Sequence, residues 1–341
     1  MKLLFIGGTG IISSACTALA VERGMDLTLL TRGQHGAHLP SAPGVKTLFA
    51  DVNDPALIER LQEESFDAVV DWIAFTPADV ERDLKLFKGR TRQFVFISSA
   101  SAYQKPSEHY LITESTALIN PFWSYSRDKI ACEERLMRAY RDEGFPVTIV
   151  RPSLTYGETL IPLVLNSWQK SYTAVERMIR GKKIVVPGDG TSLWVITHNT
   201  DFAKGLIGLL GQQEAIGEAF HITSDEVLTW DQIFRTVGEA IGVEPKLVHI
   251  PSDFIAACLP DKKGTLLGDK SVSVVFDNSK IKRFVPGYSA TTTLAEGIRR
   301  SLAWFNADPA RKEIDTEVND RLEKLISAFE EGMSGAEKEF Q

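Results

Sequence analysis

Three side chains of types that can move a proton occur close together in the sequence. Tyr125 and Lys129 are four positions apart, so they share one face if their segment is helical. A phenol with its ordinary pKa is a poor base at neutral pH, whereas a nearby ammonium favours the phenolate and lowers that pKa. Ser99 follows an apolar, strand-like run and can hydrogen-bond a substrate oxygen. Together these residues predict proton transfer at a hydroxyl or carbonyl oxygen.

A glycine-rich turn near the N-terminus indicates which cofactor accompanies the proton. The turn follows an apolar run and opens a helix, where backbone N–H groups bind the pyrophosphate of a dinucleotide. Glycine allows the tight turn and the close approach of the backbone, while Ser13 replaces the third glycine of the usual fingerprint. A purely structural turn is the alternative. The predicted cofactor contacts here are Gly7, Thr9, Gly10, Ile11 and Ile12.

The end of the second strand distinguishes NAD from NADP. Proteins that bind NAD carry an acidic residue there for the ribose 2′-hydroxyl, whereas this chain has Thr31 and Arg32. Because a guanidinium pairs with a phosphate in a bidentate manner, NADP is the predicted cofactor, with NAD as the alternative. Arg32 could equally be a solvated loop residue. Asp51 and Val52, after the third strand, suit a contact with the adenine, although they also suit a turn.

The hydrophobic pattern predicts the elements that position these residues. Short apolar runs alternate with amphipathic segments in the first half of the chain, which indicates right-handed crossovers and a mostly parallel sheet covered by helices on both faces. The predicted fold is therefore α/β, a Rossmann-type doubly wound parallel sheet. Predicted strands are 3–6, 26–30, 47–49, 68–73, 93–97 and 146–150, and predicted helices are 14–23, 79–87, 124–143 and 201–210.

Glycine, proline and polar loops become more frequent after Gly157, which predicts a second unit. We assign 1–157 to the dinucleotide-binding domain, with 195–220 returning to it. A smaller C-terminal α+β substrate lobe comprises 158–194 and 221–312. The last segment, 313–341, is predicted to be a charged amphipathic helix followed by a polar tail.

Composition limits the classes of function. The chain has 341 residues, is 43% hydrophobic and carries a formal charge of −7, so nucleic acid is an unfavourable partner. Three scattered cysteines predict neither a disulfide framework nor a metal site. The apolar runs are only strand-length, and the N-terminal one is too short for a signal peptide. These features predict a cytoplasmic protein with no membrane segment.

Several motifs taken together resemble the extended short-chain dehydrogenase/reductase superfamily, also called the NAD-dependent epimerase/dehydratase family. The resemblance covers nearly the whole chain, and it is greatest to an atypical branch that contains the chloroplast stem-loop-binding proteins. Those proteins share the Gly-Gly-Thr start, the Thr-Arg-Gly after the second strand and an Asp at position 71. The motifs are Gly7-Gly8-Thr9-Gly10, Asp51-Val52, the serine-rich run 98–103, Tyr125 with Lys129, 151–157, 187–190, and His198 with Asp201.

The resemblance implies a role for each matching residue. Ser99, Tyr125 and Lys129 are expected to be the catalytic residues, with Lys129 also binding the nicotinamide ribose. Ala74, Ser98, Pro152 and Ser153 are expected to contact the cofactor. The expected substrate contacts are Ser101, Trp123, Leu154 and Trp194.

Departures from the family pattern narrow the expected reaction. Ala100 and Ser101 replace the Asp-Glu pair of the dehydratases, which disfavours elimination of water. Leu154 and Trp194 replace an Asn and an Arg that nucleotide-sugar enzymes use, although Lys170 or Arg177 could supply a replacement anchor. The prediction is an NAD(P)-dependent oxidoreductase or epimerase of a sugar or sugar-like compound, acting as a homodimer. The alternative is an RNA-binding or cofactor-sensing protein on the same scaffold.

Overall fold

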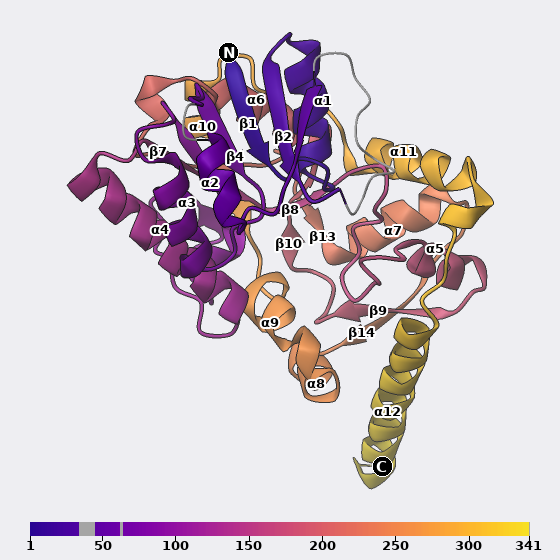
Figure 1. The fold of residues 1–341 in the computed structure, drawn as a ribbon. Helices are drawn as coiled ribbons and strands as arrows, with labels where there is room; N and C mark the ends of the chain where they lie inside the picture. The colour runs from indigo at the N-terminus through magenta and orange to yellow at the C-terminus, as the bar shows by residue number, and fades with distance from the viewer. Residues whose placement is uncertain (34–44, 62–63, 341) are drawn as a thin grey trace.

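A seven-stranded parallel sheet forms the centre of the larger domain (Figure 1). The computed structural model describes residues 1–33, 45–61 and 64–340. The strand order is β12-β7-β5-β4-β1-β2-β3, and this confirms the predicted doubly wound α/β fold. The strands are β1 (Lys2–Ile6), β2 (Asp26–Thr31), β3 (Val45–Phe49), β4 (Ala68–Asp71), β5 (Phe94–Ile97), β7 (Val147–Pro152) and β12 (Ala219–Ile222).

Helices cover both faces of this sheet because successive strand residues point to opposite sides. In β1, Leu3 and Phe5 join one core, whereas Leu4 and Ile6 join the other. The first core is closed by α1 (Ser13–Glu22), α6 (Asn199–Leu209) and α10 (Ser279–Phe284), and the second by α2 (Pro55–Leu61), α3 (Pro77–Phe87) and α4 (Ser124–Glu143).

The order of the strands reverses direction between β1 and β4. From β1 the chain builds outward through β2 and β3, and it then returns to place β4, β5, β7 and β12 on the other side. In such sheets the ligand crevice lies at this reversal, outside the carboxyl ends of the strands. The loops after β1 and β4 therefore flank the expected cofactor site.

A smaller lobe lies at the carboxyl edge of the sheet (Figure 1). Its core contains two stacked tryptophans, Trp194 and Trp230, whose ring centroids are 5.4 Å apart. Its strand pairs are β6 (Leu111–Ile112) with β15 (Val275–Phe276), β8 (Leu154–Tyr156) with β11 (Ile196–His198), β9 (Lys183–Pro187) with β14 (Lys246–Ile250), and β10 (Leu193–Trp194) with β13 (Leu228–Thr229). Its helices are α5 (Tyr172–Ile179), α7 (Trp230–Ala240), α8 (Ser252–Cys258), α9 (Lys263–Thr265), α11 (Leu294–Asn306) and α12 (Thr316–Phe340).

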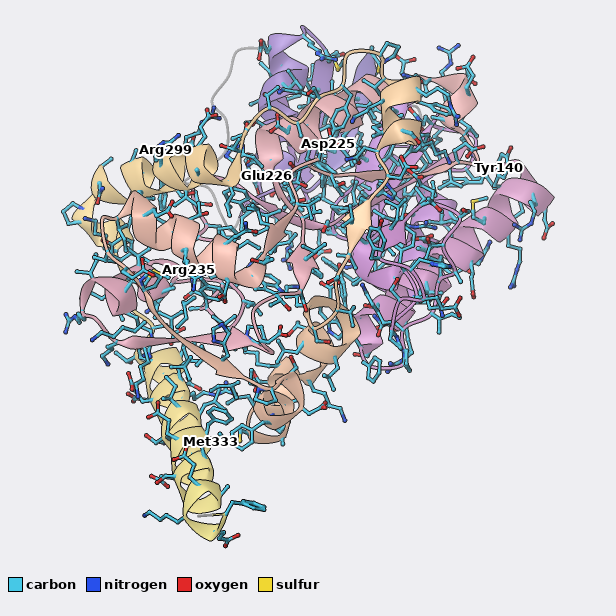
Figure 2. The ribbon with its side chains drawn as sticks, turned by 180° about the vertical axis from the view of Figure 1, so that it is seen from behind. Tyr140, Asp225, Glu226, Arg235, Arg299 and Met333 are labelled. Carbon is cyan, nitrogen blue, oxygen red and sulfur yellow. The ribbon has the colours of Figure 1, made fainter. Side chains whose placement is uncertain are left out.

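Two segments differ from the division expected from the sequence. Helix α10 packs on the sheet through Ile281 and Phe284, although 221–312 was expected to belong to the lobe. Helix α12 continues to Phe340 instead of ending in a polar tail, and Leu322, Leu325 and Ile326 anchor its first half in the lobe. Its second half projects beyond the lobe, where Met333 is exposed (Figure 2).

Candidate active site

The loop between β1 and α1 requires glycine at two positions. Gly7 and Gly8 have φ values of +96° and +103°, a region that side chains disfavour. A Cβ on Gly8 would lie only 2.8 Å from Cδ2 of Leu29. Thr17 of α1 donates its hydroxyl to the Gly8 carbonyl at 2.8 Å, which ties the turn to the helix that follows. The local sequence therefore determines a compact turn at the ligand crevice.

The start of α1 has the features of an anion site. Within the described structure, its N-cap residue Ile12 makes no side-chain capping bond, and the first turn contains no acidic residue. The backbone N–H groups there carry the positive end of the helix dipole. Asn199 of α6 holds the loop from outside by donating to the Ile11 carbonyl at 2.7 Å. These features fit the pyrophosphate of a dinucleotide.

A cavity of about 1210 Å³ extends from this loop to the smaller lobe. It passes the carboxyl ends of β2, β3 and β5 and the start of α4, so it brings together residues that are far apart in the sequence. The predicted site residues that line it are Gly7, Thr9, Gly10, Ile11, Ile12, Thr31, Arg32, Asp51, Val52, Ser98, Ser99, Ser101, Trp123, Tyr125, Lys129, Pro152, Ser153 and Leu154.

Two predicted site residues are not on the cavity wall. Ala74 is buried, and its carbonyl oxygen accepts a hydrogen bond of 2.6 Å from Nζ of Lys129. Trp194 is 2% exposed and stacks on Trp230 in the core of the lobe. The prediction that Trp194 contacts the substrate is therefore wrong, because a large indole is buried most favourably where a second aromatic ring can cover it.

Hydroxyl groups form a short chain beside Tyr125. Ser99 and Ser101 share a hydrogen bond of 2.9 Å between their hydroxyl oxygens, and Ser126 donates its hydroxyl to Ser101 at 2.8 Å. Ser99 lies two residues after the end of β5 and caps a 3₁₀ turn, η2 (Ala100–Ala102). Ser126 was not among the predicted residues, although its position next to Tyr125 on α4 was a usable signal.

The environment of Tyr125 raises the pKa of its phenol, contrary to the lowering expected from Lys129. Burial is the largest cause, the carboxylate of Asp269 adds to it, and the Ser99 hydroxyl opposes it. Tyr125 therefore carries its proton at neutral pH. A protonated phenol beside a hydroxyl chain is suited to donate a proton to an oxygen.

Lys129 is buried and held in a fixed position. Its ammonium donates to the carbonyl oxygens of Ala74 at 2.6 Å and Ile97 at 2.7 Å, and it lies 4.5 Å from the ring centroid of Phe75. Burial lowers the pKa of Lys129 to about 8, and the neighbouring acidic groups partly offset this effect. The side chain is thus anchored between the loops that follow β4 and β5.

Asp71 organises the loop after its own strand. Its Oδ1 accepts the backbone N–H groups of Ile73 at 2.6 Å and Ala74 at 2.8 Å, and its Oδ2 pairs with Arg82 at 3.2 Å. Asp51 behaves as a turn residue, since Oδ1 accepts the backbone N–H of Asn53 at 2.9 Å. It also lines the cavity, so both proposed roles remain open to it.

The lobe end of the cavity contains residues that sequence reasoning missed. Asp269 and Lys270 form an ion pair of 2.9 Å there. The suggested replacement anchors lie elsewhere: Lys170 pairs with Glu313 at 3.0 Å, and Arg177 is buried against α12. The additional lining residues include Phe75, Asp79, Arg82, Asn166, Trp168, Gln169, Lys262, Thr265, Asp269, Lys270 and Asp315.

Histidine is a common acid or base in enzymes, but His109, His198, His221 and His249 are not among the residues that line the cavity. His198 caps α6 by accepting the backbone N–H of Thr200, and burial lowers its pKa to about 4. His221 lies in a buried network in which its Nδ1 bonds the hydroxyl of Tyr103 at 3.0 Å. Both histidines therefore have structural roles.

Comparison with known proteins establishes the family. The model of the NAD dependent epimerase/dehydratase family matches residues 3–223, which include the glycine loop, Ser99, Tyr125 and Lys129. The chain belongs to this family. As a member of the epimerase/dehydratase family, it is an enzyme of the extended short-chain dehydrogenase/reductase type.

Curated relatives of this epimerase/dehydratase family member carry different names. A 2'-dehydrokanamycin reductase from Streptomyces kanamyceticus is 27% identical over 84% of this chain and 80% of its own. The chloroplast stem-loop binding protein of 41 kDa b from Arabidopsis thaliana is also 27% identical, over 95% of this chain and 85% of its own.

Solved structures share the fold. An epimerase from Methanothermobacter thermautotrophicus superposes with a TM-score of 0.73 at 18% identity, covering 90% of this chain and 92% of its own. The UDP-glucuronic acid 4-epimerase from Bacillus cereus in complex with NAD has a TM-score of 0.71 at 19% identity, covering 91% of this chain and all of its own. At these identities the likeness concerns the fold of the epimerase/dehydratase family alone.

Two kinds of feature are absent from the part of the chain that the structure describes. None of its helices is long and apolar enough to cross a bilayer. Among the same residues, no group of three or more His, Cys, Asp and Glu side chains is arranged to hold a metal ion.

Proposed function

We propose that this enzyme reduces a carbonyl group of a sugar or sugar-like compound, with NADPH as the hydride donor. The observation that carries the proposal is that Ser99, Tyr125 and Lys129 line the same cavity as the glycine loop. The nicotinamide, when bound, supplies the hydride to the carbonyl carbon. Tyr125 gives its proton to the carbonyl oxygen, which Ser99 holds by a hydrogen bond.

Lys129 has two roles in this proposal. Its ammonium lies between the Ala74 and Ile97 carbonyls at the cavity wall, where it would bind the ribose of the cofactor. Its positive charge stabilises the phenolate that forms when Tyr125 has given up its proton. Ser101 and Ser126 extend the hydroxyl chain beside Ser99 and fix the orientation of its hydroxyl.

The raised pKa of the Tyr125 phenol is in keeping with reduction, in which the phenol begins as the proton donor. An epimerase must first remove a proton from a substrate hydroxyl, and a phenol whose pKa is raised by burial is a poorer base for that step. The name of one relative, a dehydrokanamycin reductase, is in keeping with this direction.

The lobe end of the cavity supports a substrate without a diphosphate. Trp123 and Trp168 offer aromatic faces, and Asp269 and Lys270 are paired with each other. Arg177 was a candidate to bind a diphosphate, but its guanidinium donates hydrogen bonds to Glu323 and Asn319 of α12. We therefore expect keto derivatives of free sugars or aminosugars to bind better than nucleotide sugars.

The test follows nicotinamide absorbance with a panel of keto sugars and nucleotide sugars. A reductase consumes NADPH in proportion to the product formed. Epimerised product with no net consumption would show an epimerase. RNA binding is the competing function, which similarity to the stem-loop binding protein supports; a salt-sensitive gel shift with structured RNA, without turnover, would establish it. A cytoplasmic homodimer remains our expectation, and sedimentation analysis tests its dimeric state.

Arg32 is expected to determine the preference for NADP. It lines the cavity at the end of β2 and is exposed. Because the bonds of a guanidinium to a phosphate contribute ~1.5–3 kcal/mol, Arg32→Ala should weaken NADPH binding by roughly 10–100-fold and leave NADH binding unchanged. Fluorescence titration measures both affinities.

Arg23→Ala is the matched control, since Arg23 is an exposed arginine at the end of α1 and is not among the lining residues. Equal losses for both cofactors in Arg32→Ala, or tighter binding of NADH by the unaltered enzyme, would contradict an NADP site.

A further inference from the structure

The side chain of Asn120 is buried, and all of its hydrogen-bonding groups have partners. It is 3% exposed and lies just before α4. Its Nδ2 donates to the carbonyl oxygens of Ser101 at 2.8 Å and Gly268 at 2.6 Å. Its Oδ1 accepts the backbone N–H groups of Phe122 at 3.2 Å and Trp123 at 3.1 Å. An amide side chain offers two donors and two acceptor sites, so each is satisfied here.

The partners of Asn120 belong to three separate parts of the candidate site. Ser101 lies in the turn η2, next to Ser99. Trp123 is the N-cap residue of α4, two positions before Tyr125. Gly268 lies in a π-helix of the lobe, η5 (Leu266–Lys270), which also contains Asp269 and Lys270. The Asn120 side chain therefore connects the start of α4, which carries the proton donor Tyr125, with the turn η2 and with the substrate end of the cavity.

These segments are in close contact around Asn120. A Cβ on Gly264 would lie 2.4 Å from Cδ1 of Trp123, and one on Gly268 would lie 2.9 Å from its Cβ. The Trp123 ring is in turn 4.8 Å from the Tyr125 ring, centroid to centroid. Because the backbone of η5 touches the start of α4 directly, a displacement of one segment displaces the other. π-Helices are frequently found at functional sites.

We propose that Asn120 is a positioning residue, which fixes Tyr125 relative to Ser99 and fixes η5 over the substrate. This inference rests on the proposed reduction by Tyr125, and it adds the residue that aligns the two domains for it. Asn120 is not itself on the cavity wall, so it acts through the residues that it holds. Misplacement of a reacting group by about 1 Å can cost ~100-fold in rate.

The variant Asn120→Asp tests this role with almost no change in volume. The carboxylate still accepts the two N–H groups before α4, but it cannot donate to the Ser101 and Gly268 carbonyls. Oxygen would then face oxygen, which pushes η2 and η5 away from α4. We expect kcat to fall by roughly 10–100-fold, with NADPH affinity within twofold of the unaltered enzyme because the glycine loop is elsewhere. Asn120→Ser provides a second variant if the carboxylate prevents folding.

Asn278 supplies a matched control. It is also 3% exposed and is not among the lining residues, and its Nδ2 donates to the Thr223 carbonyl at 3.0 Å, the Ser224 carbonyl at 3.3 Å and Oδ1 of Asp225 at 2.9 Å. Asn278→Asp places its carboxylate against these oxygens, so it should lower the unfolding midpoint at least as much as Asn120→Asp and leave kcat unchanged below that midpoint.

A readout without turnover separates this inference from the proposed function. Tyrosine labelled with ¹³C at Cζ reports the surroundings of the Tyr125 phenol by NMR, and Tyr125→Phe assigns its signal. The Tyr125 signal should shift in Asn120→Asp and stay fixed in Asn278→Asp. An unchanged signal, or a kcat within threefold in both Asn120 variants, would overturn the positioning role. If no substrate of the panel is reduced, the proposed function fails while the NMR comparison still decides the role of Asn120.

Discussion

Tyr125→Phe is expected to lower kcat for carbonyl reduction by roughly 10²–10⁴-fold, the usual contribution of a positioned general acid. The variant removes one hydroxyl and keeps the ring, so its packing against Trp123 and Phe75 persists. NADPH affinity should stay within twofold. Steady-state kinetics and a fluorescence titration measure the two effects.

Tyr110→Phe is the control, because Tyr110 is 65% exposed and is not among the lining residues. It should leave both quantities unchanged. If Tyr125→Phe turned over normally, another group would have to donate the proton. Equal losses of turnover and of cofactor affinity would show that the phenol supports binding and has no part in proton transfer.

Arg151→Met is expected to produce the largest loss of stability, ~3–5 kcal/mol, because it leaves a buried carboxylate without its partner. Arg151 in β7 binds Glu133 of α4 through Nη2 at 2.6 Å and through Nε at 3.0 Å and 3.2 Å. Both side chains are buried, and Ser98 also donates to Glu133. The pair of charges raises the pKa of Arg151 above its usual value. Urea denaturation measures the free energy of unfolding.

Arg135→Met is the matched control on the surface. Arg135 of α4 pairs with Glu81 of α3, where both side chains remain partly exposed, so the expected loss is below ~1 kcal/mol. The double variant Arg151→Met with Glu133→Leu should recover much of the lost stability, since no unpaired charge remains. Similar losses for Arg151→Met and Arg135→Met would contradict the importance of burial.

Helix α4 shows how far a local pattern can predict this structure. The predicted helix, 124–143, has the bounds that the structure gives. Its buried residues recur every three or four positions from Ser126 to Ala139, and Gly144 ends the helix with a φ of +68°. The turn after β1 is similar, because the positive φ angles at Gly7 and Gly8 require the glycines that the sequence shows.

Trp194, Arg177 and Asn120 show where local patterns are insufficient. Trp194 lies in a two-residue strand and is covered by Trp230, while Arg177 is bound by α12 residues over 140 positions away. Asn120 bonds Gly268 across 148 positions. Whether such a side chain is exposed, and which distant residues it contacts, depends on how whole helices and strands pack together. A short stretch of sequence contains no information about that packing.

The sequence by itself determined the alternation of strands and helices, the glycine loop and the Tyr125–Lys129 spacing, because strand and helix periods and backbone freedom are local properties. The tertiary structure alone decided the raised pKa of Tyr125, the position of η5 beside the cavity and the Asn120 contacts. Each of these features arises where segments from both domains pack closely enough to exclude water. Desolvation and close contact are properties of that packing, so they emerge only when the chain is folded.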